Sequence, residues 1–569
     1  MYTRQIGGSR RVDTPTGAAD LRIHLMGPHP IVRHFLGRMN FARIVNGCLG
    51  TAEQSRLDHA QTLAVLVQNI LLAPSPLYRI SEWVVPIDHA ALGLSEAEKQ
   101  TINDDRVART LDALASPRAR NLFFRLALRV IKEFELDVQR IHHDTTSVSF
   151  SGRYRQSWLD PRLALGHSKD RRPDLRQLVF GLNVTADGAV PVSHFVVSGN
   201  RTDDTVHRNN LDELRAIVGG DDFIYVADSK LCTAKNISHI ANYGGQFVTV
   251  LPRTRAEDKH FRNTLRNAMS PVRWRKLEET PDSRGGEPIV YHTTVDAPPM
   301  TNDGYRIVWF RSSQRATLDA ATRETNLGRT VAELADLRTK LNKRQYKSRA
   351  VIAAKVAQIL REFRCQSFLE VQIRSRTVPE KRYKSRGRPG TNARPQIIPR
   401  RVFDLEVQRN VQALRAEART DGVFPIITNV PSPQCGKAKL LHIYKYQPYI
   451  EKRHSLLKSE LVVAPVFLKK PHRASGLLHA AFLAMMVDAL IERTLRRGML
   501  LHEVDGLPLL PEHRNTTSPT TARLLEAFSD LAWCEFERAG ELVTFPIKLT
   551  AMHRKLLKLL DIDPRAAYG

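Results

Sequence analysis

Three acidic residues are the strongest candidates for chemistry in this sequence. Asp144 lies where a predicted strand begins, among small hydroxyl residues that can support a carboxylate by hydrogen bonds. Asp228 closes the apolar strand that starts at Phe223, and the carboxyl end of a buried strand is where α/β folds place ligands. Glu451 lies far downstream in a polar helical pattern. Carboxylate oxygens suit hard divalent cations such as Mg²⁺.

The late acid belongs to a spaced set on a helix predicted over residues 444–460. Tyr444, Gln447, Glu451 and Lys458 follow one another at intervals that fall along one stripe of an α-helix. A solvated helix face explains such spacing equally well. Taken alone, Asp144 also fits a turn and Asp228 a helix N-cap, so the weight of the prediction comes from the three acids together.

Other chemistry-bearing residues favour structural roles. His142 and His143 precede Asp144, but neighbouring strand residues point to opposite faces, so both cannot share one ion with it. Trp274 and Trp309 could stack on an unpaired base, although core packing is the simpler account.

The charge balance predicts a polyanionic partner. Lys and Arg total 86 against 59 Asp and Glu, a net charge of +27, which favours nucleic acid over a membrane surface. Residues 338–401 hold 19 Lys or Arg against three Glu, so over half of the excess lies there. Within that segment, residues 386–389 resemble the core of a minor-groove hook through Arg386 and Arg388, and contact with the DNA backbone is the alternative that we favour. The neighbouring Lys381, Arg382 and Lys384 are also expected to contact DNA.

Cysteine usage and apolar runs bear on location. The five cysteines lie far apart without zinc-ligand spacing, which indicates a reducing compartment. The first eleven residues lack the apolar run of a signal peptide, and the longest apolar segment, 477–490, is expected to be a buried helix. A cytoplasmic protein without a membrane partner is the expectation.

The element pattern predicts an α/β fold with helical ends. Three strands, a helix and a fourth strand follow one another between Val138 and Val226, the order of a ribonuclease-H-like core interrupted by a large insertion. We expect five segments: a helical DNA-binding or accessory domain at 1–135, the first part of the catalytic core at 136–252, a β-rich and basic insertion at 253–420, the second part of the core at 421–470, and a helical region at 471–569.

These motifs together resemble the DDE transposases of bacterial insertion sequences, in the branch with a Tyr-x2-Arg-x3-Glu-x6-Lys signature and a β-rich insertion. The similarity spans about residues 136–500. It rests on three blocks: 143–147 with 166–175 and Gly199-Asn200; 226–229 with Asn236; and Asp421-Gly422 and Thr428-Asn429 ahead of Tyr444, Glu451 and Lys458, with Ser459, Arg473 and His479 after them.

The resemblance implies a mechanism and its partners. Asp144, Asp228 and Glu451 would hold two Mg²⁺ ions, with Mn²⁺ as a substitute, for cutting the ends of an element and joining their 3′-hydroxyls to target DNA. Tyr444 and Lys458 would contact the terminal inverted repeat, and a homodimer is expected in the DNA complex. Gln447 is also expected to contact the DNA end, but it stands where the signature has arginine. It can hydrogen-bond a phosphate, yet it brings no charge and no bidentate fork. The resemblance further implies a bacterial, nucleoid-associated protein.

Two alternatives to an active transposase remain open. One is a DNA-binding descendant that no longer cuts, which the three intact acids disfavour. The other is a junction-resolving nuclease of the same fold, which leaves the signature and the basic insertion unexplained.

Overall fold

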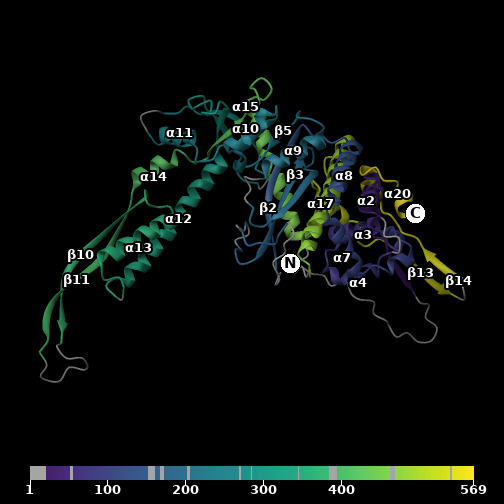
Figure 1. The fold of residues 1–569 in the computed structure, drawn as a ribbon, viewed down its shortest axis with the longest axis horizontal. Helices are drawn as coiled ribbons and strands as arrows, with labels where there is room; N and C mark the ends of the chain where they lie inside the picture. Colours follow the sequence, from purple (N-terminus) through teal and green to yellow (C-terminus); the bar gives the residue numbers. More distant parts are fainter. Residues whose placement is uncertain are drawn as a thin grey trace. The chain divides into compact units, whose positions relative to one another are not determined.

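The chain forms two compact units in the computed structural model (Figure 1). Unit 1 comprises Met1–Val248 and His442–Gly569, and unit 2 comprises Thr249–Leu441. The structure describes all residues except 1–20, 51–55, 152–160, 167, 168, 170, 171, 202–205, 268–270, 283, 284, 344, 384–393, 462–467, 469, 539 and 540.

Unit 1 begins with a helical region, as the sequence predicts. The apolar residues expected to form its core, such as Ile31, Phe35 and Leu66, are fully buried. Asp58 caps the third helix by accepting a hydrogen bond from the Gln61 amide. The elements are β1 (Arg22–Leu25), α1 (His29–Arg38), α2 (Phe41–Leu49), α3 (His59–Leu72), η1 (Leu77–Arg79), α4 (Ile80–Val84), α5 (His89–Leu92), α6 (Glu96–Lys99), α7 (Asp104–Leu114) and α8 (Ala119–Glu133).

A mixed sheet follows, and its strands lie in the order β4-β3-β2-β5-β6. The strands β2, β3 and β4 are antiparallel neighbours, whereas β5 runs parallel to β2 and β6 runs parallel to β5. The elements are β2 (Arg140–Phe150), β3 (Arg176–Thr185), β4 (Pro191–Ser198), α9 (His207–Val218), β5 (Ile224–Val226), η3 (Ser229–Leu231), α10 (Ala234–Asn242) and β6 (Gln246–Val250).

Two details of this sheet bear on the sequence predictions. The Asp-Gly turn between β3 and β4 is present, and Gly188 there has φ of +87°, a conformation that glycine adopts without strain. Two short apolar runs, 138–141 and 148–150, suggest two strands, but β2 is continuous through the polar residues between them. Those residues find partners inside the protein: His142 bonds Gln447 and His143 bonds Asn183.

The chain returns to unit 1 with the rest of its helices and two strands. The longest helix, α17, contains the apolar segment 477–490 and is buried, as the sequence predicts. It has the length and composition to cross a membrane, but 94% of its most apolar window is buried within the protein. The elements are α15 (Lys437–Lys445), which starts in unit 2, α16 (Gln447–Leu456), the π-helical turn η4 (Leu457–Leu461), α17 (Pro471–Leu501), η5 (Pro511–His513), α18 (Thr521–Glu526), β13 (Ala532–Arg538), β14 (Glu541–Phe545), α19 (Ala551–Leu559) and α20 (Pro564–Tyr568).

The C-terminal region is therefore not purely helical. The strands β13 and β14 form a three-stranded antiparallel sheet with β1 from the start of the chain, in the order β1-β13-β14. Tyr568 near the C-terminus donates a hydrogen bond to the carbonyl of Gly27 over 2.8 Å. Segments from both ends of the sequence thus share one folded body.

Unit 2 combines an antiparallel sheet with a long arm. Its sheet strands lie in the order β12-β9-β8-β7, and the β10-β11 hairpin runs beside α12 and α13 and extends beyond them (Figure 1). The elements are α11 (Ala256–Arg266), β7 (Arg275–Thr280), β8 (Ile289–Thr293), β9 (Arg306–Ser312), α12 (Ser313–Lys340), α13 (Arg349–Glu362), β10 (Leu369–Arg382), β11 (Gln396–Arg409), α14 (Val411–Ala418) and β12 (Val423–Thr428).

Candidate active site

The register of two parallel strands brings Asp144 and Asp228 to the same level of the unit 1 sheet. Arg140 of β2 pairs with Ile224 of β5, and His142 pairs with Val226, an offset of 84 residues. The same offset relates Asp144 to Asp228, which lies two residues beyond the end of β5 in extended backbone. Residues two apart on a strand share a face, so both carboxylates face the same side of two adjacent strands.

Asp228 also caps a short helix. Its Oδ1 accepts a hydrogen bond from the backbone N–H of Lys230 over 2.9 Å, at the start of η3. The N-cap role that the sequence left open is therefore real. It does not exclude metal binding, because a carboxylate has two oxygens and about four lone pairs.

Gln447 anchors α16 to the strand that carries Asp144. Its Nε2 donates to the carbonyl of His143 over 2.9 Å, and its Oε1 accepts from His142 Nδ1 over 3.2 Å. The side chain is buried, as is His142, whose pKa burial lowers to about 4. Gln447 therefore fixes helix to strand in this structure and does not present itself for the DNA contact that the resemblance implies.

Glu451 follows Gln447 by one helical turn and so lies on the same side of α16. Partial burial and the negative charge of Asp144 raise the pKa of Glu451, while the Lys169 cation opposes that shift. The two carboxylates are thus close enough to repel each other. A divalent cation would relieve that repulsion.

Two further side chains surround Asp144. The Lys169 ammonium lies 3.7 Å from Oδ1 and donates to the carbonyl of Thr145. His454 Nε2 lies 3.7 Å from Oδ2, and this ring is buried. Burial, together with the Lys169 and Lys458 cations, lowers the pKa of His454 to about 3, so the ring is neutral at physiological pH.

Sequence reasoning missed His454, although its position carries a signal. It follows Gln447 by seven residues, two helical turns, and therefore lies on the face of α16 that looks toward β2. Neither of its ring nitrogens has a well-formed hydrogen bond among the described residues. A buried polar group left without such a bond beside a carboxylate is typical of a site that completes its interactions with a ligand.

The other members of the expected signature do not share one straight helix with Glu451. Tyr444 lies in the last turn of α15, and the chain breaks at Tyr446 before α16 begins. Pro448 explains the break, because proline has no N–H to donate to the carbonyl four residues earlier. Lys458 lies in the π-helical turn η4, which changes the phase of the residues after Leu457. The single helix over 444–460 is a wrong prediction.

The three acids fit a hard divalent cation in donor chemistry, but they are not drawn into one tight cluster. Among the residues that the structure describes, no three His, Cys, Asp or Glu side chains are grouped closely enough to form a metal centre. Asp144 and Glu451 form a repelling pair, and Asp228 lies just beyond the end of β5, the strand next to the one that carries Asp144. None of the five cysteines forms a disulfide, and none belongs to a grouping of three potential metal ligands among the described residues.

The basic residues predicted to bind DNA lie in unit 2. Lys381 and Arg382 are exposed at the far end of β10. Lys384, Arg386 and Arg388 lie outside the described residues.

Of the two tryptophans, Trp309 is buried against Phe261, with ring centroids 4.3 Å apart, and donates to the carbonyl of Pro298. Core packing therefore accounts for Trp309.

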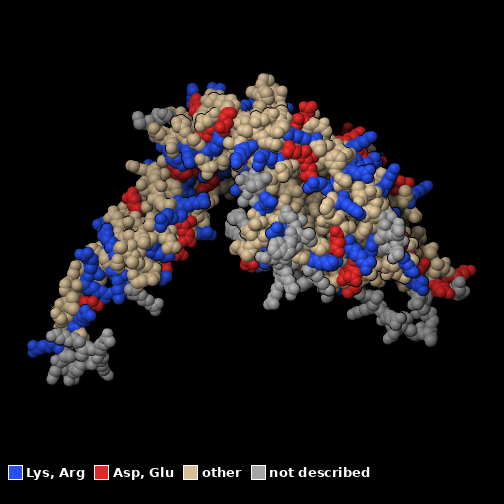
Figure 2. Space-filling model, viewed as in Figure 1, with Lys and Arg blue, Asp and Glu red and all other residues tan. Residues whose placement is uncertain are grey.

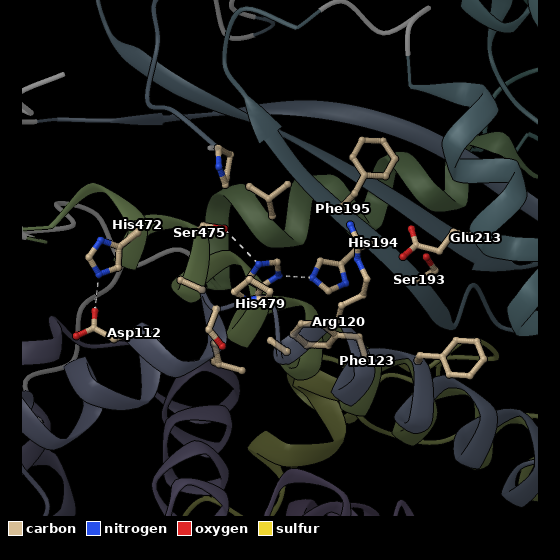
Figure 3. Close-up of a pocket in the computed structure, with 18 of the residues that line it drawn as sticks. Asp112, Arg120, Phe123, Ser193, His194, Phe195, Glu213, His472, Ser475 and His479 are labelled. Atoms are coloured by element: carbon tan, nitrogen blue, oxygen red, sulfur yellow. Dashed lines mark hydrogen bonds and ion pairs between the residues drawn. The ribbon is translucent and has the colours of Figure 1, made fainter. Parts of the chain in front are cut away.

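A separate cavity of about 590 Å³ lies in unit 1 between α8, β4, α9 and α17 (Figure 3). His194 Nε2 and His479 Nδ1 share a hydrogen bond of 2.6 Å at its wall, and Ser475 bonds the other nitrogen of His479. Burial lowers the pKa of both histidines, that of His479 to about 4, so the pair is neutral. None of the three candidate acids lines this cavity.

Comparisons with known proteins add little beyond this geometry. Residues 21–128 match a family model described as a domain of unknown function, DUF4277, which covers only the helical start of the chain. No curated protein matches. Among solved structures, the chain is similar to a piggyBac transposase in a synaptic complex with hairpin DNA, at 12% identity and a TM-score of 0.26. That alignment covers 50% of this chain and 58% of the piggyBac chain, and so low a score carries no argument for the fold.

Proposed function

We propose that the protein is a DDE-type transposase that cuts and joins DNA with divalent metal ions held by Asp144, Asp228 and Glu451. The observation that carries the proposal is the parallel register of β2 and β5, which puts two aspartates level on one face of the sheet. The third acid comes from α16, which Gln447 fixes to the same strand.

The proposal includes a ribonuclease-H-like core. Its support is the strand order β4-β3-β2-β5-β6, in which three antiparallel strands precede two parallel ones, with α9 and α10 as the crossovers. The active-site acids of such a core lie on the first strand, after the fourth strand and on a later helix. In this proposal Asp144 on β2, Asp228 after β5 and Glu451 on α16 would take those three places.

The chain's own residues would prepare the reaction as follows. Bound Mg²⁺ or Mn²⁺ would activate the attacking oxygen and stabilise the leaving one in an in-line displacement. Asp144 and Glu451 lie close together, so their negative charge favours cation binding. Lys169 and Lys458 flank this site and would attract the phosphate of the substrate.

Several finer points belong to the same proposal. The substrates would be the terminal inverted repeats of an insertion element and its target DNA, and the protein would act as a homodimer in the bacterial cytoplasm. The net charge of +27 supports a DNA partner. Tyr444, half-buried in α15, would contact the element end from beside the acids.

One observation favours a second candidate, a DNA-binding descendant that no longer cuts. The described residues include no ready grouping of three metal ligands, and a lysine already lies beside Asp144. Such a protein would bind DNA without any dependence on Mg²⁺.

The test is cleavage of a supercoiled plasmid that carries the gene with its flanking DNA, in the presence of Mg²⁺. Asp228→Asn should abolish cleavage and leave DNA binding measurable, because it removes a ligand charge and keeps the shape of the side chain. The matched control is Asp222→Asn, an exposed aspartate just before β5, which should cut like the wild type. Full cleavage of the plasmid by Asp228→Asn would contradict the proposal. A wild-type protein that binds DNA but never cuts it would favour the second candidate.

A further inference from the structure

The arm of unit 2 ends in a strip of antiparallel hairpin that nothing in the described chain covers. We call this strip the distal ribbon: residues 376–382 of β10 paired with residues 396–402 of β11. None of its residues is buried, on either face. An isolated two-stranded sheet is marginally stable in water, so this strip depends on what holds its base.

The base of the hairpin is held by a hydrophobic cluster. One face of the hairpin carries Val371 opposite Val407 and Ile373 opposite Leu405, with Phe403 next along the same face of β11. This face packs on α12 and α13 through residues such as Leu334, Ile352 and Ile359. The cluster makes the base of the arm a fixed support, from which the distal ribbon extends as a preformed two-stranded element.

The distal ribbon is strongly basic. It carries five cations, Arg376, Lys381, Arg382, Arg400 and Arg401, against the single carboxylate of Glu380. Lys and Arg are visible along this arm in Figure 2.

Only one of these cations is neutralised within the ribbon. Arg400 pairs with Glu380 at 2.9 Å. The other four form no ion pair with any carboxylate that the structure describes, in contrast to Arg374 nearer the base, which pairs with Glu406. The charge of the ribbon is therefore available to a partner.

The free cations occupy both faces of the ribbon. By strand alternation Arg376 and Arg382 share one face, while Lys381 shares the other with Arg401, which pairs with Thr377. From residue 376 to 382 the strand rises roughly 20 Å. A slender element with charge on both faces suits insertion between two charged walls better than docking on a flat surface.

We propose that the distal ribbon inserts into the major groove of double-stranded DNA, with its cations contacting the phosphates on both sides. The major groove, about 12 Å wide, admits a two-stranded β-ribbon as it stands, whereas the minor groove, about 6 Å wide, must first be widened by deforming the duplex. The proposal rests on the proposed function only in taking DNA as the partner. It differs from the minor-groove contact expected of residues 386–389, which lie outside the described residues.

A second copy of the chain fits the ribbon less well. Pro379 and Pro399 face each other directly in the ladder. Proline has no N–H, so each removes a donor that a further strand would need, and prolines are a common guard against strand addition at sheet edges. The like charge of two ribbons would also repel.

The first experiment measures DNA affinity against salt, using full-length protein with Asp228→Asn so that the DNA stays intact. The ribbon variant combines Arg376→Gln, Lys381→Gln, Arg382→Gln and Arg401→Gln. Its matched control removes four exposed charges from α19 and α20: Arg554→Gln, Lys555→Gln, Lys558→Gln and Arg565→Gln. Circular dichroism checks that both fold.

The ribbon variant should bind a mixed-sequence duplex at least about tenfold more weakly, with a salt slope shallower by roughly 2 to 4, since each lost phosphate contact contributes about 0.9. The control should change much less. Equal losses in the two variants, or none in the ribbon variant, would overturn the proposal. So would unchanged DNA binding with a smaller assembly in light scattering, which would make the ribbon an oligomer contact.

A second experiment tests the groove. Methylation of guanine N7, which projects into the major groove, should interfere with binding of the parent protein and not of the ribbon variant. An A-form RNA duplex should compete poorly, because its major groove is too deep and narrow. The groove assignment would be contradicted if N7 methylation left binding of the parent protein unchanged. It would also be contradicted if the RNA duplex competed as well as a DNA duplex. Neither experiment measures cleavage. A failure of the ribbon proposal can therefore be told apart from a failure of the catalytic proposal.

Discussion

At the scale of single residues, the candidate site places two carboxylates where their negative charges repel each other. Glu451 has a raised pKa because it is partly buried beside the negative charge of Asp144. Buried His454 faces the same Asp144 without a well-formed hydrogen bond of its own. Sites that bind ligands commonly retain such arrangements at a cost in stability.

Glu451→Gln should therefore stabilise the protein in the absence of metal. A raised pKa means that the folded state disfavours the ionised carboxylate, so the native Glu451 destabilises the fold above its ordinary pKa of 4.5 and ceases to do so below it. We expect a melting temperature higher by a few degrees at most at pH 7 to 8, because the partly buried side chain still contacts solvent and water screens the repulsion. The difference in melting temperature between Glu451→Gln and the wild type should become smaller toward pH 5.

The control for this measurement is Glu541→Gln, another exposed glutamate of unit 1. It should leave the melting temperature unchanged at every pH. A Glu451→Gln protein that melts below the wild type at pH 8 would contradict the charge repulsion inferred here.

At the scale of elements, the sequence predicted which strands and helices form better than how they join. The succession of strands along the chain follows from alternating apolar runs, and the Asp-Gly turn follows from its turn residues. Both are local signals in the sequence. The predicted helix over 444–460 overlooked Pro448, whose backbone effect was readable in the sequence. His454 escaped notice because its partner, Asp144, is distant in sequence and only the packing of α16 on β2 brings them together.

Gln447 supplies a test of that packing. Gln447→Ala removes two hydrogen bonds between α16 and β2 and leaves buried His142 without its partner. We expect a loss of about 1–3 kcal/mol in the free energy of unfolding, measured by urea denaturation.

The same substitution separates anchoring from DNA contact. In an Asp228→Asn background, Gln447→Ala should leave DNA affinity unchanged below the melting transition, because the side chain is buried. A selective loss of DNA affinity in a fully folded Gln447→Ala protein would instead favour the contact implied by the family signature.

At the scale of the whole molecule, the division of the chain was only partly visible in the sequence. The expected insertion at 253–420 lies within unit 2, Thr249–Leu441, which continues through β12 and the segment after it. Arg306 of β9 donates to the carbonyl of Cys435 over 2.8 Å and so ties that segment to unit 2. No local sequence pattern predicts a hydrogen bond between residues so far apart in the chain.

Unit 1 should be unusually sensitive to acid. Burial lowers the pKa of nine of its histidines below 6.5: His29, His34, His59, His142, His143, His194, His207, His454 and His479. These rings stay neutral in the folded state while the unfolded chain takes up protons, so stability is present above pH 6.5 and lost as the pH falls toward 4. Calorimetry should show unfolding coupled to the uptake of several protons at pH 5. A melting temperature that stays flat from pH 7 to 4.5 would refute this.

A change of metal preference tests whether Asp144, Asp228 and Glu451 hold the metal ions that we propose for DNA cleavage. Asp228→Cys replaces a hard oxygen ligand with a thiolate, which binds Mg²⁺ poorly and softer Mn²⁺ better. In the plasmid assay we predict that Asp228→Cys is inactive with Mg²⁺ and regains cleavage with Mn²⁺, while the wild type cuts with both. Cleavage by Asp228→Cys at the wild-type rate in Mg²⁺ would contradict the account.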